Sequence, residues 1–131
     1  YYRMLGLVMS TATFPFGGLA ACAVLTQAMR EAVGPTDADS SDYVGLIRYA
    51  AGTVVALFLR EEPTPEGLKV KLSVRARPGV SAQRICTSLG GGGHVAAAGA
   101  TLFEPLDAAQ ARTLGAVRAE LERAGYAVPE A

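Results

Sequence analysis

The stretch between Leu68 and Arg75 alternates strictly between apolar and polar residues, in the order LKVKLSVR. Successive side chains of a β-strand point to opposite faces, so this pattern predicts a strand with one buried face and one polar face. The polar face would carry Lys69, Lys71, Ser73 and Arg75. A chain with such a segment must build a sheet whose polar side stays accessible at this strand.

Further segments predict the partners of this strand. Residues 53–59 are β-branched and apolar, which favours a central strand that forms a hairpin with residues 68–75 across a proline-containing turn at residues 61–67. Residues 19–25 and 100–103 predict two more strands, although a helix is the alternative for the alanine-containing run at 19–25. We expect helices over residues 1–12, 26–33, 43–51, 81–89 (capped by Ser81) and 107–125 (capped by Asp107), a polar loop at 37–42, and a short alanine helix between Gly93 and Gly99.

Helices interleaved with strands, together with one hairpin, predict an α/β fold with a small mixed sheet flanked by helices. The chain has 131 residues, of which 50% are hydrophobic, and this is enough for one domain with one core. Cys22 and Cys86 match no metal-ligand spacing, so we expect two buried, reduced thiols. No apolar run has the length of a membrane span and no signal peptide is visible, which predicts a cytoplasmic protein.

Charge is unevenly distributed along the chain, although the formal net charge is zero. No acidic residue occurs between Leu68 and Phe103. The basic residues of this stretch are Lys69, Lys71, Arg75, Arg77, Arg84 and His94. A basic region in a neutral protein predicts a face for an anion, while the alternative is an ordinary solvated face.

Four glycines, Gly90 to Gly93, lie inside this basic region and precede the only histidine, His94. If a helix begins there, its unpaired N–H groups and its dipole would attract a phosphate, which glycine allows to approach the backbone closely. Arg75, near the end of the polar strand, could hold phosphate oxygens with two hydrogen bonds, and His94 could donate another. The alternatives are a tight glycine turn and a surface histidine.

The motif GGGGHVAAAGA resembles the GGGH-x-x-AAG signature of the DHH-associated (DHHA) C-terminal domain of DHH-family phosphoesterases. The upstream KLSVRAR is similar to the Ser-x-Arg-Ser strand of that family, although Ala76 stands where the family has its second serine. Within the family, the chain most resembles the group of oligoribonucleases and pAp phosphatases that includes cyclic-dinucleotide phosphodiesterases.

The resemblance implies a division of labour with a larger N-terminal domain. That domain would hold manganese ions through an Asp-His-His motif, while the present domain presents the substrate, which would be a short oligoribonucleotide, pAp or a cyclic dinucleotide. Arg75 and His94 would contact a substrate phosphate beside Ser73, and Gly91, Gly92 and Gly93 would line the pocket. Residues 1–17 would be the end of a linker helix and a hinge, and residues 18–131 the substrate-binding domain.

One histidine in the whole chain is too few for a two-metal phosphoesterase centre, so we expect no metal site in this chain and no hydrolysis by it alone. The start at Tyr-Tyr-Arg predicts a fragment of a longer polypeptide. Two other functions stay open: a stand-alone nucleotide or nucleic-acid binding module without catalysis, and a purely structural domain. A long single-stranded substrate is disfavoured because no row of aromatic residues is available for base stacking.

Overall fold

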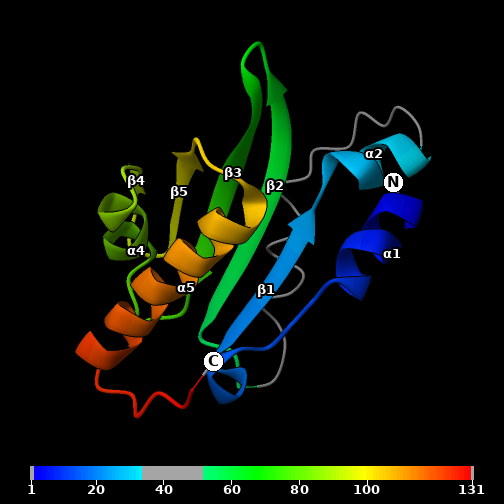
Figure 1. The fold of residues 1–131 in the computed structure, drawn as a ribbon. Coiled ribbons are helices and arrows are strands. Elements are labelled where there is room, and N and C mark those ends of the chain that lie inside the picture. Colours follow the sequence, from blue (N-terminus) through cyan, green and yellow to red (C-terminus); the bar gives the residue numbers. More distant parts are fainter. Residues whose placement is uncertain (1, 34–51, 131) are drawn as a thin grey trace.

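A five-stranded mixed sheet forms the centre of the computed structural model, which describes residues 2–33 and 52–130 (Figure 1). The strand order is β1-β2-β3-β5-β4, with β1 parallel to β2 and all other neighbours antiparallel. The strands are β1 (Ala20–Leu25), β2 (Val55–Thr64), β3 (Gly67–Ala76), β4 (Gly92–Gly93) and β5 (Ala97–Leu102). The helices of the described residues are α1 (Tyr2–Ser10), α2 (Gln27–Val33), α4 (Ala82–Ser88) and α5 (Leu106–Arg123), with a 3-10 turn η1 (Phe16–Gly18).

This architecture confirms the predicted α/β fold with a mixed sheet and one long hairpin. The expected loop at 37–42 and helix at 43–51 lie outside the described residues. The division of the chain at residue 17 stays a prediction, although Val8 of α1 is buried in the same cluster as residues of β1 and β2. None of the helices within residues 2–33 and 52–130 is both long and apolar enough to cross a membrane.

Helices lie on both sides of the sheet. On one side, α4 and α5 pack over a large core to which β3 contributes Val70, Leu72 and Val74, as the alternation predicted. On the other side, α1 and α2 contact β1 and β2 around a smaller core that includes Phe58. The polar residues of β3 point to this second side and are partly exposed. We call this side of β3 and β5 the open face.

The β2–β3 hairpin is longer than the sequence predicted. Strand β2 continues to Thr64, which pairs with Gly67, so the expected turn at 61–67 is wrong in extent. Pro63 is tolerated inside the strand because β1 pairs with β2 only as far as Arg60, which leaves the outer side of Pro63 without a partner strand. The hairpin therefore projects beyond its neighbours, as the green arm of Figure 1 shows.

The expected alanine helix after the glycine run is wrong. Gly92–Gly93 and Ala97–Leu102 form a hairpin instead, closed by hydrogen bonds from the His94 N–H to the Ala97 oxygen (2.8 Å) and from the Ala97 N–H to the His94 oxygen (3.2 Å). Ala98 and Ala100 are buried in the core beside α4, and pairing with β3 outweighs the helix propensity of alanine. A phosphate site at a helix N-terminus following the glycines is therefore excluded.

The predicted helix caps are confirmed in part, and the predicted buried cysteines are confirmed. Ser81 caps α4 as predicted, since its hydroxyl oxygen accepts the Arg84 N–H at 3.0 Å. Asp107 is not the cap of α5: Pro105 occupies that position, and Asp107 lies in the first turn, where its charge still complements the helix dipole. Cys22 and Cys86 are free and buried, as predicted, and burial raises the pKa of each thiol to about 11.

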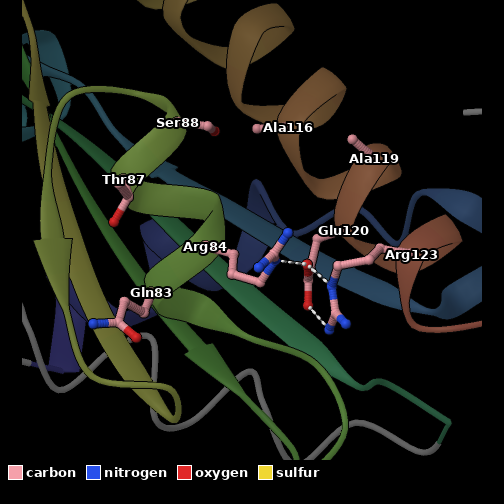
Figure 2. Close-up of a pocket in the computed structure, with 8 residues that line it drawn as sticks. All are labelled: Gln83, Arg84, Thr87, Ser88, Ala116, Ala119, Glu120 and Arg123. Carbon is pink, nitrogen blue, oxygen red and sulfur yellow. Dashed lines mark hydrogen bonds and ion pairs between the residues drawn. The ribbon is translucent and has the colours of Figure 1, made fainter.

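A buried carboxylate, Glu120, connects α5 to the start of α4 (Figure 2). Its oxygens accept hydrogen bonds from the Ser81 N–H (2.7 Å) and from two nitrogens of Arg123 (2.7 and 2.6 Å), and Arg84 Nε lies 3.3 Å away. Hydrogen bonding from Arg123 is the main cause of the lowered pKa of Glu120. Around this cluster lies a groove of about 650 Å³, which we call the α4–α5 groove.

Candidate functional site

Residues of three strands form rows across the open face. Ser73 of β3 pairs with Gly99 of β5, which in turn pairs with Gly92 of β4. Two residues along β3 in either direction, Arg75 pairs with Ala97 and Lys71 pairs with Thr101. Side chains two residues apart on a strand are about 6.6–6.8 Å apart, so polar groups stand at intervals along β3 beside a floor of small residues.

A hollow of about 480 Å³ lies on this face. Arg60 and Lys71 supply positive charge, Ser73 and Thr101 supply hydroxyl groups, and Phe103 borders it. Its other lining residues are Leu72, Gly90, Gly91, Gly99 and Ala100. A floor of glycines with basic and hydroxyl side chains beside it offers hydrogen-bond donors to an anion.

The two cations of the hollow differ in their partners. Lys71 Nζ donates to the Thr101 hydroxyl oxygen at 3.1 Å, and no carboxylate of the described residues lies within ion-pair distance of it. Arg60 Nε is 2.9 Å from a carboxylate oxygen of Glu62, while Arg60 Nη1 is buried and has no hydrogen-bond partner in the part of the chain that the structure describes. Arg60, Thr101 and Phe103 were not among the residues predicted from the sequence.

Arg75 lies outside this hollow, at the end of β3. It borders a smaller hollow of about 220 Å³ together with Ala56, Ala76 and Arg77. Arg75 Nη1 donates to the Val74 oxygen at 3.2 Å. Arg77 Nε donates to the Thr53 oxygen at 2.6 Å, so this neighbouring guanidinium is engaged by the backbone.

His94 occupies the turn between β4 and β5 and is exposed. Because Ala97 pairs with Arg75 and is also hydrogen-bonded to the backbone of His94, both residues lie at the same end of the open face. The Ala76 N–H donates to the Ala96 oxygen at 3.0 Å, which ties this turn to β3. The structure thus places Arg75 and His94 at one end, Ser73 and Gly92 in the middle, and Lys71 and Arg60 towards the other end.

The three predicted pocket glycines differ in the space around them. A Cβ on Gly91 would collide with the Gly99 carbonyl oxygen and lie 2.6 Å from the Cβ of Ala100. A Cβ on Gly93, which has a φ of +142°, would lie 2.6 Å from the Cα of Ala98. Only Gly92 faces open space, with nothing within 4 Å of the Cβ position. Gly91 and Gly93 therefore allow close packing of the hairpin, whereas Gly92 leaves room for a ligand.

The open face offers hydrogen-bond donors, whereas a metal ion needs a cluster of electron-pair donors. Within residues 2–33 and 52–130, no group of three or more His, Cys, Asp or Glu side chains is placed to hold a metal ion. The donor set of the described residues therefore does not fit a two-metal centre, and its N–H and O–H groups suit phosphate oxygens.

Comparison with known proteins identifies the family of this domain. Residues 23–122 match the DHHA1 domain, a range that contains every predicted site residue. The chain belongs to the DHHA1 domain family. This confirms the resemblance that the GGGH motif and the polar strand indicated. In the structure of this DHHA1 domain, strand pairing brings the two motifs together on one face of the sheet.

Among curated proteins, the DHHA1 domain is 54% identical over 127 residues to the bifunctional oligoribonuclease and PAP phosphatase NrnA of Thermus thermophilus. The match covers 96% of this chain but 36% of that protein, so the chain spans little more than a third of its relative's length.

Two solved structures share the fold. An exopolyphosphatase-related protein from Bacteroides fragilis matches with a TM-score of 0.81 at 21% identity, over 95% of this chain and 36% of that one. The pGpG-specific phosphodiesterase PggH from Vibrio cholerae matches with a TM-score of 0.61 at 11% identity, over 89% of this chain and 38% of that one. At these identities the two likenesses show the fold alone.

Proposed function

We propose that this DHHA1 domain binds the phosphate of a short nucleotide substrate on its open face, as the substrate-binding part of a DHH phosphoesterase. The observation that carries the proposal is the glycine floor between Ser73 and Gly92, flanked by cations that no described carboxylate neutralises at Arg75 and Lys71. Its 54% identity to an oligoribonuclease and PAP phosphatase supports a nucleotide as the ligand.

Several residues of the open face would contribute to binding the phosphate. The open space at Gly92 lets a phosphate approach the backbone, and the Ser73 hydroxyl in the same row donates to it. Arg75 holds a phosphate oxygen pair with its planar guanidinium, and His94 adds a donor from the neighbouring turn. Lys71 and Arg60 extend the positive region along the face towards Phe103.

The related oligoribonuclease and PAP phosphatase indicates the substrate class. Short oligoribonucleotides and pAp are our first candidates, and cyclic dinucleotides are an alternative with the same phosphate chemistry. Manganese ions, held by a separate Asp-His-His domain, would supply the Lewis acid and the activated water for hydrolysis. The residues of this chain would bind and orient the phosphate, which matters because in-line attack needs accurate positioning.

The test is calorimetric titration of the chain with pAp and with a 5′-phosphorylated diribonucleotide. Binding is expected for the wild type and is expected to be abolished in Gly92→Val, whose side chain fills the open space without a clash at Cβ. Gly115→Val is the matched control, because its Cβ position in α5 is also open but lies away from the open face. Circular dichroism checks that both variants fold.

Three results would contradict the proposal or part of it. Unchanged affinity in folded Gly92→Val would mean that the glycine hairpin is only a turn. Clear turnover of either nucleotide by the purified chain with added manganese would show that the chemistry lies in this chain, against the division between a metal domain and a binding domain. Tight binding with no DHH domain in the parent polypeptide would favour a stand-alone binding module.

A further inference from the structure

Phe103 is the most exposed of the large hydrophobic residues that the structure describes, with 80% of its surface accessible to solvent. It follows β5 directly and precedes α5, so its backbone is held at both ends by regular structure. Leaving an aromatic side chain of this size in water sacrifices the free energy that burial would provide. The exposed ring is therefore available for contact with a ligand.

The position of the ring links it to the open face. Phe103 borders the hollow that Arg60, Lys71 and Ser73 also line. It also borders a second hollow of about 420 Å³, which is lined by the apolar residues Leu68, Val70, Pro105 and Leu106 and by the acidic residues Glu61 and Glu104. The ring thus stands on the rim of the open-face hollow, between it and a second hollow of mixed character.

The charge beside the ring is also favourable for a nucleotide. Glu104 is the first acidic residue after the basic stretch, and its carboxylate is paired with Arg112 of α5 at 2.5 Å. This pairing neutralises the one negative side chain adjacent to Phe103 in sequence on its C-terminal side. A phosphate in the open-face hollow is therefore not opposed by an unpaired Glu104. Glu61 lines only the second hollow, where its carboxylate accepts the Gln27 N–H at 2.9 Å.

We propose that Phe103 stacks on the base of the bound nucleotide and selects nucleotides over phosphate chains that lack a base. This inference rests on the proposed function of the open face. A nucleotide carries an anionic phosphate and a planar base, and the rim offers cations and one aromatic ring within the same hollow. A single ring serves one terminal base, whereas proteins that hold long single strands stack successive bases on several aromatic side chains.

The test compares pAp with inorganic tripolyphosphate as titrants of the same variants. Phe103→Ala is expected to weaken pAp binding about tenfold, the size of one base–aromatic stack, and to leave tripolyphosphate binding unchanged. Phe14→Ala is the matched control, because Phe14 is also exposed (52%) but lines no part of the hollow. Its affinity for both titrants is expected to equal that of the wild type.

A spectroscopic readout makes the contact direct. The chain contains no tryptophan, so Phe103→Trp introduces a single tryptophan at the rim, which can be excited selectively beside the five tyrosines. We expect pAp, but not tripolyphosphate, to quench its fluorescence, and we expect this variant to bind pAp at least as tightly as the wild type.

The outcomes separate this inference from the function on which it rests. If the wild type binds pAp and Phe103→Ala binds it equally well, the stacking role is wrong and the phosphate site stands. If Phe103→Ala weakens both titrants equally, the ring supports the fold or the hollow and does not read a base. If the wild type binds neither titrant, the proposed function and this inference both fail.

Discussion

The α4–α5 groove and the open face both carry arginines, yet they differ in how far those charges are paired. In the groove, the buried carboxylate of Glu120 lies within ion-pair distance of both Arg84 and Arg123, so both arginines are paired although one net positive charge remains (Figure 2). The open face has one paired arginine, Arg60, whose Nε lies 2.9 Å from a carboxylate oxygen of Glu62. On the open face, Arg75 and Lys71 have no described carboxylate within ion-pair distance, and their polar contacts are to a carbonyl and a hydroxyl. The groove is the larger of the two, at about 650 Å³ against 480 Å³.

The difference shows that size and the presence of arginine do not identify an anion site. An arginine paired with a buried carboxylate cannot serve an incoming phosphate without weakening that ion pair, which is costly. An arginine that donates to a neutral carbonyl, as Arg75 does, can exchange that bond for a stronger, charge-assisted one. This difference supports our proposal that the open face serves binding and that the groove serves stability.

The largest effect is expected at Gly91. Gly91→Ala is expected to lower the free energy of unfolding by about 3 kcal/mol, because its Cβ would collide with the Gly99 oxygen and crowd Ala100 in the β4–β5 hairpin. Urea denaturation followed by circular dichroism measures the change. Gly92→Ala is the control and is expected to change stability by less than about 0.5 kcal/mol, since its Cβ meets open space. Equal losses at the two positions would remove the distinction between packing and ligand space.

Glu120→Ala is the corresponding test of the groove. We expect a loss of about 2 kcal/mol in the free energy of unfolding, because the Ser81 N–H is left without its partner at the start of α4. Affinity for pAp should stay within twofold of the wild-type value in the folded protein. Glu122→Ala, at a largely exposed position on the same helix, is the control and should have little effect. Loss of pAp binding by folded Glu120→Ala would place the groove in the binding machinery.

The pH dependence of stability adds a second check on Glu120. Its pKa is lowered in the folded state, chiefly by hydrogen bonding from Arg123, so its contribution to stability is present above the ordinary carboxyl value of 4.5 and is lost as the pH falls through the folded value. The stability difference between the wild type and Glu120→Gln should therefore be largest near neutral pH and shrink on acidification. A constant difference down to pH 3 would contradict this role of the ionised carboxylate.

The sequence predicted the face of Ser73 and Arg75 because a period of two is unambiguous in a half-buried strand. It failed at residues 94–99, where alanines match both a helix and a strand and only pairing with β3 decides between them. Arg60 was missed because β2 is buried on both faces, so its sequence lacks the alternation that would assign Arg60 to a side. The motif indicated Gly91, Gly92 and Gly93 together, and only the atomic contacts separate Gly92 from the other two.

Arg75→Ala is expected to weaken pAp binding at least tenfold, a loss of about 1.4 kcal/mol, with Arg75→Lys recovering only part of it because the planar fork is lost. In a longer polypeptide that also carries the proposed metal domain, the loss should appear in kcat/KM, because a misplaced phosphate would not be aligned for in-line attack. Arg84→Ala is the matched control: it removes an arginine of the groove that is more exposed than Arg123 (63% against 44%) and should leave pAp affinity unchanged. Equal losses at Arg75 and Arg84 would mean that net charge, and not position, determines binding.

The smallest effect is expected from the lysines of β3, and it defines the extent of the site. Lys71 lines the hollow and Lys69, two residues further from Ser73 on the same face, does not. Lys71→Ala should weaken pAp binding about threefold, roughly 0.6 kcal/mol, because a partly exposed ammonium contributes mainly through a field that salt screens. Lys69→Ala, which removes the same charge, should have no measurable effect, and the Lys71 loss should shrink when the titration is repeated at high salt. If the two variants lose affinity equally, the phosphate is held by a diffuse basic surface and the hollow is not its site.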